Sequence, residues 1–317
     1  MTANEQVEYL MEIITMPFTY IVSPEKRIYF FYLITSLLLA WFVYRKKARK
    51  DSFLGFVFNK KVWLGKSPLV DYIFIFFNSL VKVLIIAPIL VYALYSVEQV
   101  NLYLINTFGE STLNWSATQI AIVYTVVLIV SNDFGAFFVH YLMHKVPFLW
   151  QFHKIHHSAT VLNPLTQYRI HPVELIVNNL RIAFIKISIT GVFMYLGNGK
   201  VSLFTFLGIN VFNFLFLSFG ANLRHSHVKL KYFDFLEYLF ISPYQHQIHH
   251  SNKKELYDTN MGARLAIWDY LAGTLVRSKS VDKLDFGLGE EEDGKYDTFW
   301  KNLMSPFKNL LGLNKNK

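Results

Sequence analysis

The 317-residue sequence contains no cysteine. This absence excludes disulfide bonds, thiolate-bound zinc and an iron–sulfur cluster held by the chain's own thiolates. The usual motifs of nucleotide-binding and hydrolase sites are missing as well, since there is no P-loop, no G-x-G-x-x-G and no G-x-S-x-G. The first ten residues, MTANEQVEYL, carry no basic stretch ahead of an apolar one, so they do not predict a cleaved signal peptide.

Charged residues are scarce along several long apolar runs. Hydrophobic residues make up 53% of the chain, and the mean hydropathy is +0.29. This apolar excess predicts a membrane protein rather than a larger soluble core. The formal net charge of +9 comes from basic residues that lie between and after the apolar runs. That placement favours anionic lipid headgroups over nucleic acid as their partner.

The apolar runs and the charges between them predict a topology. The runs cover residues 28–44, 69–96, 117–139, 173–196 and 201–220. Basic residues crowd the segment 45–66, which the positive-inside rule places in the cytoplasm, whereas 97–116 has no Lys or Arg and should lie opposite. The third run then delivers His140 to the cytoplasmic side. GNGK at 197–200 predicts a tight turn that returns the chain to that side, whether the last pair spans fully or is re-entrant. Lys82 is expected to snorkel or to pack within the bundle.

Histidine is absent before residue 140 and clustered after it. The chain contains H-x-x-x-H at 140–144, H-x-x-H-H at 153–157 and again at 246–250, and H-x-H at 225–227. Helix residues three or four apart share a face, so the members of a cluster can converge on one point. Neutral imidazole is the commonest metal-binding side chain, and protonated rings facing one another would repel. These clusters therefore predict metal binding.

The number and type of ligands indicate which metals suit the site. Eight to ten imidazoles are too many for one ion, so two ions are expected. All-nitrogen ligation suits zinc, iron, copper or nickel. A zinc hydrolase would usually include carboxylates and has little need of a membrane. Iron with open coordination positions would activate oxygen and attack an inert C–H bond of an acyl or sterol chain held against it.

Two further residues are placed near the histidines by their spacing. Asp133 lies seven residues before His140, on the same helix face. A carboxylate inside a spanning helix is costly, so we expect it to accept the free ring N–H of a ligand histidine. The alternative is a helix-packing hydrogen bond to Asn or Tyr. His171 precedes Pro172 and has two interpretations, as a helix start or as a residue close to the metal.

The histidine motifs HYLMH, HKIHH and HQIHH resemble the three histidine boxes of the membrane fatty acid hydroxylase/sterol desaturase superfamily. The resemblance continues through HHSATVLNPLTQYRIHPVE, LRHSHVKL, YDTNMG and WDYLAGT, and it covers about residues 130–275. Tyr141 departs from the Arg that many members carry, and Met261 from a frequent aromatic residue. The resemblance implies these metal ligands: His140, His144, His153, His156, His157, His225, His227, His246, His249 and His250. It also implies four residues around them: Asp133, His171, Asp258 and Asn260.

The same resemblance implies the activity and its requirements. We expect a non-haem di-iron oxidoreductase with two iron ions, which uses O2 to hydroxylate or desaturate a fatty acyl, sterol, ether or sphingoid lipid. Hydroxylation and desaturation share hydrogen abstraction, so the histidine spacing leaves both open. No haem or flavin region is evident, so electrons should come from a separate protein, a b-type cytochrome or a ferredoxin with its reductase. The alternative is a membrane metal-binding or transport protein, which would place its ligands within the spans.

The expected fold is all-α, a polytopic integral-membrane helical bundle with a cytoplasmic, histidine-rich, metal-binding helical cap. Three regions are expected along the chain. Residues 1–116 form an N-terminal membrane region without a recognisable motif, 117–275 a fatty acid hydroxylase/sterol desaturase-like catalytic domain, and 276–317 a polar C-terminal tail. The expected location is a multi-pass position in a bacterial inner membrane or the endoplasmic reticulum.

Overall fold

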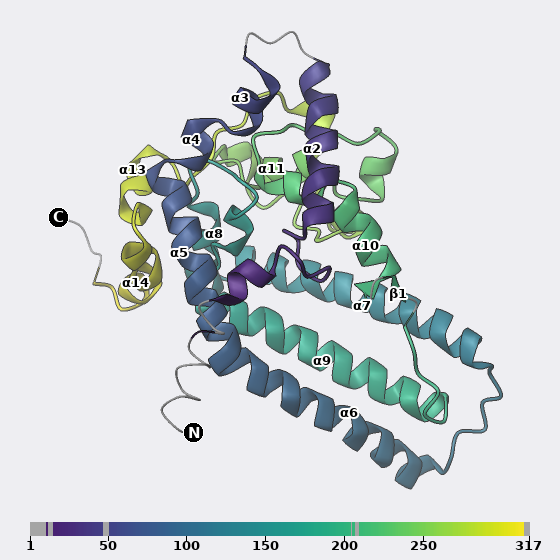
Figure 1. Ribbon diagram of the computed structural model, residues 1–317. Coiled ribbons are helices and arrows are strands. Elements are labelled where there is room, and N and C mark those ends of the chain that lie inside the picture. The colour runs from purple at the N-terminus through teal and green to yellow at the C-terminus, as the bar shows by residue number, and fades with distance from the viewer. Residues whose placement is uncertain (1–10, 12–14, 47–50, 204, 207–208, 314–317) are drawn as a thin grey trace.

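The computed structural model describes residue 11 and residues 15–46, 51–203, 205–206 and 209–313. Within these ranges the regular secondary structure is helical apart from one small hairpin and an isolated β-bridge between Phe240 and Leu265, so the predicted all-α class is confirmed (Figure 1). The hairpin pairs β1 (Thr205–Phe206) with β2 (Ile209–Asn210) in antiparallel register. The shorter helices are α3 (Phe53–Val57), α4 (Lys60–Trp63), α8 (Pro147–His157), α10 (Val211–Ser218), α11 (Pro243–His249), α12 (Ile267–Ala272), α13 (Glu290–Asp293) and α14 (Phe299–Leu310).

Three helices of the described chain are long and apolar enough to cross a membrane. They are α7 (Ala117–Lys145), α9 (Pro172–Leu196) and a continuous 43-residue helix, Lys66–Phe108. The last consists of α5 (Lys66–Val81), the π-helical turn η1 (Lys82–Ile86) and α6 (Ala87–Phe108). At 1.5 Å per residue α6 alone extends roughly 33 Å, enough for a hydrocarbon core of about 30 Å. Helices α6, α9 and α7 run side by side, with α9 packed against both others (Figure 1).

Two of the predicted apolar runs form shorter helices than expected. The run 28–44 forms α2 (Phe30–Arg45), whose 16 residues extend roughly 24 Å and fall short of a typical span. Its buried Tyr32 packs in one cluster with Phe216 of α10. The run 201–220, left open as a full span or a re-entrant segment, contains the hairpin and the eight residues of α10, so its described residues form no helix long enough to span. The GNGK turn itself is present, with φ of 47° at Asn198 and 80° at Gly199.

The long helix continues through Lys82 and Pro88, which interrupt the apolar run 69–96. Proline lacks a backbone N–H, and its ring clashes with the carbonyl four residues earlier in a regular α-helix. The wider π turn at η1 comes directly before Pro88 and accommodates that missing hydrogen bond without ending the helix. Lys82 packs inward as expected, since its amine donates to Tyr20 Oη at 3.2 Å and lies 5.2 Å from the ring centroid.

Different segments of the chain lie at the two ends of the long helices α6, α7 and α9. At one end Ser111 Oγ donates to the carbonyl of Leu196 at 3.3 Å, and Asn198 Nδ2 donates to the carbonyl of Ser111 at 3.2 Å. The α6–α7 connection therefore lies beside the turn after α9. The C-terminal end of α7 and the N-terminal end of α9 meet at the opposite end, where the histidine-bearing helices α8 and α11 are found (Figure 1).

The segment after residue 276, expected as a polar tail, is folded against the core as far as it is described. It contains the amphipathic helix α14. The ring of Phe307 lies 5.6 Å from that of Phe152 in α8, and Phe299 packs between Phe74 and Phe77 of α5. This C-terminal helix therefore supports α8, which carries three of the clustered histidines.

Gly191 tests the close approach of α9 to α6. A Cβ at this position would lie 2.6 Å from Val100 Cβ and 3.0 Å from the carbonyl oxygen of Val97. Small residues allow helices to pack closely in membranes, and forcing in extra methylenes costs about 1–3 kcal/mol. We expect Gly191→Leu to lower the apparent melting temperature of the detergent-purified protein. Val192→Leu, on the neighbouring exposed position, is the matched control and should leave that temperature unchanged.

Candidate metal centre

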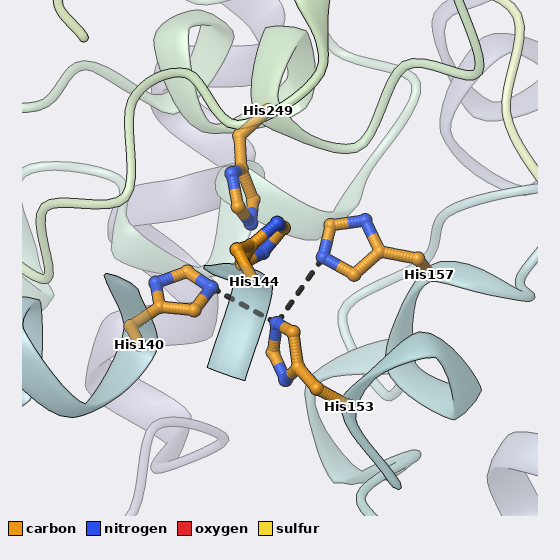
Figure 2. A group of neighbouring side chains, drawn as sticks. All are labelled: His140, His144, His153, His157 and His249. Atoms are coloured by element: carbon orange, nitrogen blue, oxygen red, sulfur yellow. Dashed lines mark hydrogen bonds between the residues drawn. The ribbon is translucent and has the colours of Figure 1, made fainter. Parts of the chain in front are cut away.

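Five histidines from three helices form the first of two groups. His140 and His144 come from α7, His153 and His157 from α8, and His249 from α11. One ring nitrogen from each lies within 4.8 Å of the corresponding atoms of the other four. Figure 2 shows the five rings turned toward a common centre. The Nε2 atom of His153 lies 3.0 Å from that of His140 and 3.3 Å from that of His157. We call this set the five-histidine group.

The second set, the four-histidine group, is buried and adjoins the first. It contains His156 of α8, His225 of the 3-10 turn η3 (Ala221–His225), and His246 and His250 of the α11 segment. The Nε2 atom of His225 lies 3.1 Å from each of the other three Nε2 atoms. The rings of His157 and His250, one from each group, stack with their centroids 4.6 Å apart. The two groups therefore adjoin through these two stacked rings.

The H-x-x-H-H spacing explains how each short helix serves both groups. Residues four apart lie on one face of a helix, so the first and last histidines of a triplet share a face. The middle histidine of the triplet lies on a different side. In α8 the outer pair, His153 and His157, enters the five-histidine group, while His156 enters the other. In the second triplet the assignment is reversed, because His246 and His250 enter the four-histidine group and His249 the first. Each triplet thus straddles the two groups.

Hydrogen bonds at the outer ring nitrogens fix which nitrogen faces inward. The Nδ1 atom of His140 lies 2.7 Å from the carbonyl oxygen of Met261, and that of His249 lies 2.8 Å from the carbonyl oxygen of Thr259. His156 Nδ1 lies 3.2 Å from the carbonyl oxygen of Arg169. A carbonyl only accepts, so Nδ1 carries the proton in these neutral rings. Each Nε2 is therefore an unprotonated lone pair directed at the centre.

This arrangement fits a bound cation. The Nε2 atoms of His144 and His249 are buried and have no hydrogen-bond partner. Nitrogen ligands bind such ions at about 2.0–2.1 Å, so two ligands of one ion lie roughly 3.0–3.4 Å apart, close to the spacings observed here. Burial lowers the pKa of His153 and His225 well below the usual value, and that of His156 to about 4. These rings are therefore neutral at pH 7 and free to act as ligands.

Carboxylates complete the outer contacts of the five-histidine group. Asp258, which was predicted to lie near the ligands, has Oδ1 at 3.2 Å from His144 Nδ1 and Oδ2 at 2.6 Å from Lys145 Nζ. The hydrogen bonds from His144 and Lys145 lower the pKa of Asp258 to about 2. Glu174, which sequence reasoning did not select, lies 3.0 Å from His153 Nδ1 through Oε1. Its place in the first turn of α9, three residues after His171, was the available signal.

Asn260 acts on the centre indirectly. Its side chain donates to the carbonyls of Gln245 and Val276, each at 3.0 Å, and accepts from the N–H of Val276 at 2.8 Å. Asp258 and Asn260 both adopt left-handed backbone conformations, with φ of 58° and 52°. These conformations turn the loop so that the carbonyls of residues 259 and 261 meet two histidine rings.

Three residues predicted near the metals lie elsewhere. Asp133 accepts from Trp268 Nε1 at 2.9 Å and from the N–H of Leu265 at 3.0 Å, so the expected bond to a ligand histidine is not formed. Two turns of α7 separate it from His140, and the backbone carbonyl of Met261 accepts the hydrogen bond from the His140 ring N–H instead. Asp133 therefore fastens the segment around Trp268 to α7.

His227 and His171 belong to neither group. His227 Nε2 lies 2.7 Å from the carbonyl oxygen of Phe56, because the extended backbone after η3 turns alternate side chains to opposite sides. Its predicted place among the ligands is therefore not observed. His171 caps α9, where Nδ1 accepts from the N–H of Val173 at 3.2 Å and Nε2 faces the carbonyl oxygen of Leu303 at 3.1 Å. The helix-start interpretation of His171 is the one that the structure supports.

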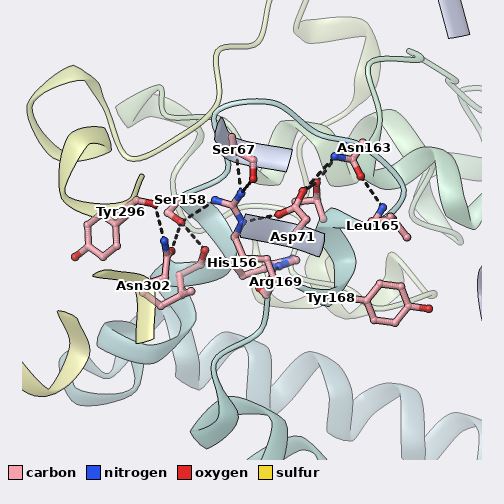
Figure 3. A network of polar contacts seen from close by, with 12 residues as sticks. Ser67, Asp71, His156, Ser158, Asn163, Leu165, Tyr168, Arg169, Tyr296 and Asn302 are labelled. Carbon is pink, nitrogen blue, oxygen red and sulfur yellow. Dashed lines mark hydrogen bonds and ion pairs between the residues drawn. The ribbon is translucent and has the colours of Figure 1, made fainter. Parts of the chain in front are cut away.

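A buried ion pair holds the chain behind His156 (Figure 3). Arg169 Nε donates to Asp71 Oδ1 at 2.6 Å, and both side chains are almost fully buried. Asp71 Oδ2 also accepts from Thr166 Oγ1 at 2.8 Å and from Asn163 Nδ2 at 3.1 Å. The carbonyl of Arg169 accepts from His156, so the pair positions a ligand contact. Asp71 was not identified from sequence, although a lone carboxylate in the apolar run 69–81 was a usable signal.

Two cavities reach the histidines. The first has a volume of about 420 Å³ and opens on the five-histidine group, where it is lined by His144, His157, His249, Trp150 and Asp258, among others. The second has a volume of about 390 Å³ and touches both groups through His140, His153, His156, His225 and His246. A ligand in the second cavity would contact both sets of histidines at once.

Asp71→Asn tests whether this ion pair supports the centre. Removing one partner leaves the Arg169 charge buried without compensation, which typically costs about 3–5 kcal/mol. We expect a lower melting temperature and weaker metal retention during dialysis against a chelator. Glu255→Gln, an exposed charge removal, is the matched control. The double variant Asp71→Leu/Arg169→Met should recover part of the lost stability, and equal losses in single and double variants would contradict the coupling.

Comparison with known proteins supplies the family of the central region. Residues 125–274 match the profile described as fatty acid hydroxylase. An ornithine lipid hydroxylase, OlsE, from Rhizobium tropici is 30% identical over 166 residues, which is 52% of this chain and 46% of that protein. An alkylglycerol monooxygenase from Xenopus tropicalis is 27% identical over 156 residues, 49% of this chain and 31% of that protein.

The chain thus spans less than half the length of these two curated relatives. No solved structure matches it. The matched region nevertheless contains all nine histidines of the two groups, from His140 to His250. The resemblance read from the histidine motifs is confirmed, because residues 125–274 of this chain match the fatty acid hydroxylase family.

Proposed function

We propose that the protein is a membrane-bound di-iron oxygenase that hydroxylates a lipid. The observation that carries this proposal is the pair of adjoining histidine groups, whose unprotonated nitrogens converge at 3.0–3.3 Å. Nine imidazoles divided five and four would hold two ions, and iron is among the metals that such ligands suit. The names of the two relatives, a lipid hydroxylase and a monooxygenase, favour hydroxylation over desaturation.

When bound, iron would supply the activation of O2 needed to oxidise a C–H bond. In the overall reaction C–H becomes C–OH, and one oxygen atom of O2 enters the product. The other leaves as water, with two electrons from a donor and two protons. The chain's own residues would hold the ions, orient the imidazoles through Asp258, Glu174 and three backbone carbonyls, and exclude bulk water by burial.

The proposed location is a membrane that the chain crosses several times, with the histidines on the cytoplasmic side. Three helices of the described chain have the required length and apolar character. The basic segment 45–66 leads into α5 at the end where Asn163 and Arg169 contact that helix, close to the histidines. The α6–α7 connection at the other end contains an acidic residue and no basic one. The positive-inside rule then supports a cytoplasmic centre.

We further propose that electrons come from a separate protein, a b-type cytochrome or a ferredoxin with its reductase. The sequence has no cysteine for a cluster of its own and no evident haem or flavin region. The cavity of about 420 Å³ reaches His144, His157 and His249 beside the polar segment Gly287–Glu292. That side of the centre is the accessible approach for such a donor.

Metal content and oxygen uptake test the proposal together. We expect two iron ions per purified chain, and oxygen consumption when a reductant and a lipid extract are supplied. Mass spectrometry of the lipids should find one species that gains one oxygen atom. Iron close to zero in protein from iron-replete cells, or bound metal without oxygen uptake, would favour a metal-binding or transport protein instead.

His156→Ala should abolish oxidation while the protein still inserts into the membrane. His156 is one of four ligands in its group, so iron per chain should fall from two toward one. His227→Gln is the matched control, since His227 lies outside both groups and should leave the iron content unchanged. Retained turnover in His156→Ala would remove this residue from the ligand set.

A further inference from the structure

The cavity that touches both histidine groups has a second, cationic wall. Four basic side chains line it: Lys26, Arg27, Lys82 and Arg224. They come from the segment before α2, from the π turn in the long helix and from η3. Histidines of both groups line the same cavity. A molecule in this cavity would therefore meet both positive charge and the candidate metal centre.

None of these cations is paired with a carboxylate of the described chain. The guanidinium of Arg27 forms no hydrogen bond or ion pair with any described residue, although its backbone carbonyl accepts from Asn222. Lys26 lies over the ring of Tyr20 at 5.3 Å, and Lys82 donates to the hydroxyl of that tyrosine. Arg224 donates to the carbonyls of Gly262 and Ala263, while its buried Nε has no partner.

The carboxylates in the same lining do not neutralise the wall. Glu174 is engaged with His153 at 3.0 Å, and Glu25 is exposed. Burial lowers the pKa of Arg27 only to about 10, so its guanidinium stays protonated at neutral pH. Arg224 is buried, and the other three cations are partly exposed. Cations that lose contact with water and gain no carboxylate partner are costly, and an anion that enters the cavity would relieve that cost.

The wall is held in place by buried contacts. Asn222 Nδ2 donates to the carbonyl of Arg27 at 2.7 Å, and Tyr32 Oη donates to the carbonyl of Pro24 at 3.0 Å. The Tyr20 hydroxyl lies 3.3 Å from Ser79 Oγ in α5. Lys26, Arg27 and Lys82 all precede the family region at 125–274. Three of the four cations thus belong to the N-terminal region, which the family match does not cover, whereas Arg224 lies within the matched region.

We propose that this wall binds the phosphate or carboxylate group of the substrate lipid. The enzyme would accordingly act on lipids with an anionic oxygen group in preference to neutral ones. The planar guanidinium of Arg27 can donate two parallel hydrogen bonds to such a group, and the lysines add charge. The apolar Ala136, Met143 and Ile170 in the same lining would contact the adjoining chain. Identifying the ligand as substrate rests on the proposed oxygenase function, whereas the binding site itself does not.

Equilibrium binding in neutral detergent separates this proposal from the oxygenase function. The full chain, as purified and without reductant, is titrated with dioleoyl phosphatidate, with dioleoylglycerol and with inorganic phosphate. The two lipids share their chains and differ in the phosphate. We expect phosphatidate to bind at least tenfold more tightly than either of the others. Equal binding of dioleoylglycerol would overturn the anionic preference, and inorganic phosphate binding as tightly as phosphatidate would overturn the lipid assignment.

Charge variants locate the site. A charge-assisted hydrogen bond to phosphate corresponds to about tenfold to a hundredfold in affinity, so Arg27→Gln should weaken phosphatidate binding by that factor. Arg27→Lys should retain part of the affinity, because it keeps the charge and loses the two-pronged geometry. Lys200→Gln, an exposed cation at the far end of α9, is the matched control and should bind as the wild type does. Unchanged affinity in Arg27→Gln would overturn the proposal, even if the protein proves to be an active oxygenase.

Discussion

Unprotonated imidazole nitrogens that face one another at 3.0–3.3 Å are the constraint on which the rest of this structure depends. Lone pairs at that spacing repel, and burial disfavours protonating the rings. A cation removes the repulsion and makes the same geometry favourable. The histidines therefore need two things from the fold: enough burial to stay neutral, and an acceptor behind each ring that fixes which nitrogen points inward.

Much of the polar architecture around the centre supplies those acceptors. The left-handed residues Asp258 and Asn260 aim two carbonyls at His249 and His140. The buried pair of Asp71 and Arg169 does the same for His156 from the other side. Desolvating that ion pair is unfavourable by itself, so its value lies in the fixed position of the Arg169 carbonyl. Polar residues that lie far apart in the sequence thus orient the ring nitrogens of the same candidate metal centre.

The sequence predicted those features of the fold and of the candidate site that depend on the spacing of nearby residues. Helical period alone brings His140 to His144 and places each H-x-x-H-H triplet on a short helix, and apolar length predicted the long helices α7 and α9. It did not predict contacts that tertiary packing decides. Asp133 shares a helix face with His140, yet Trp268 reaches it first. His227 stands two residues from His225, and the extended backbone turns it toward Phe56. The Asp71–Arg169 pair joins residues 98 positions apart, for which no sequence period exists.

The basic residues and the histidines that line the cavity of about 390 Å³ come largely from different parts of the chain, and this separates the residues that would bind metal from most of those that would select the lipid. All nine clustered histidines lie within the region that matches the family, whereas Lys26, Arg27 and Lys82 lie before it. Arg224 is the exception, because it lies beside His225 within the family region. Changes in the N-terminal segment can therefore alter which lipid is held without disturbing the nitrogens that would bind metal. The N-terminal region then has a role beyond anchoring the chain, because it forms one side of the cavity in which the ligand would lie.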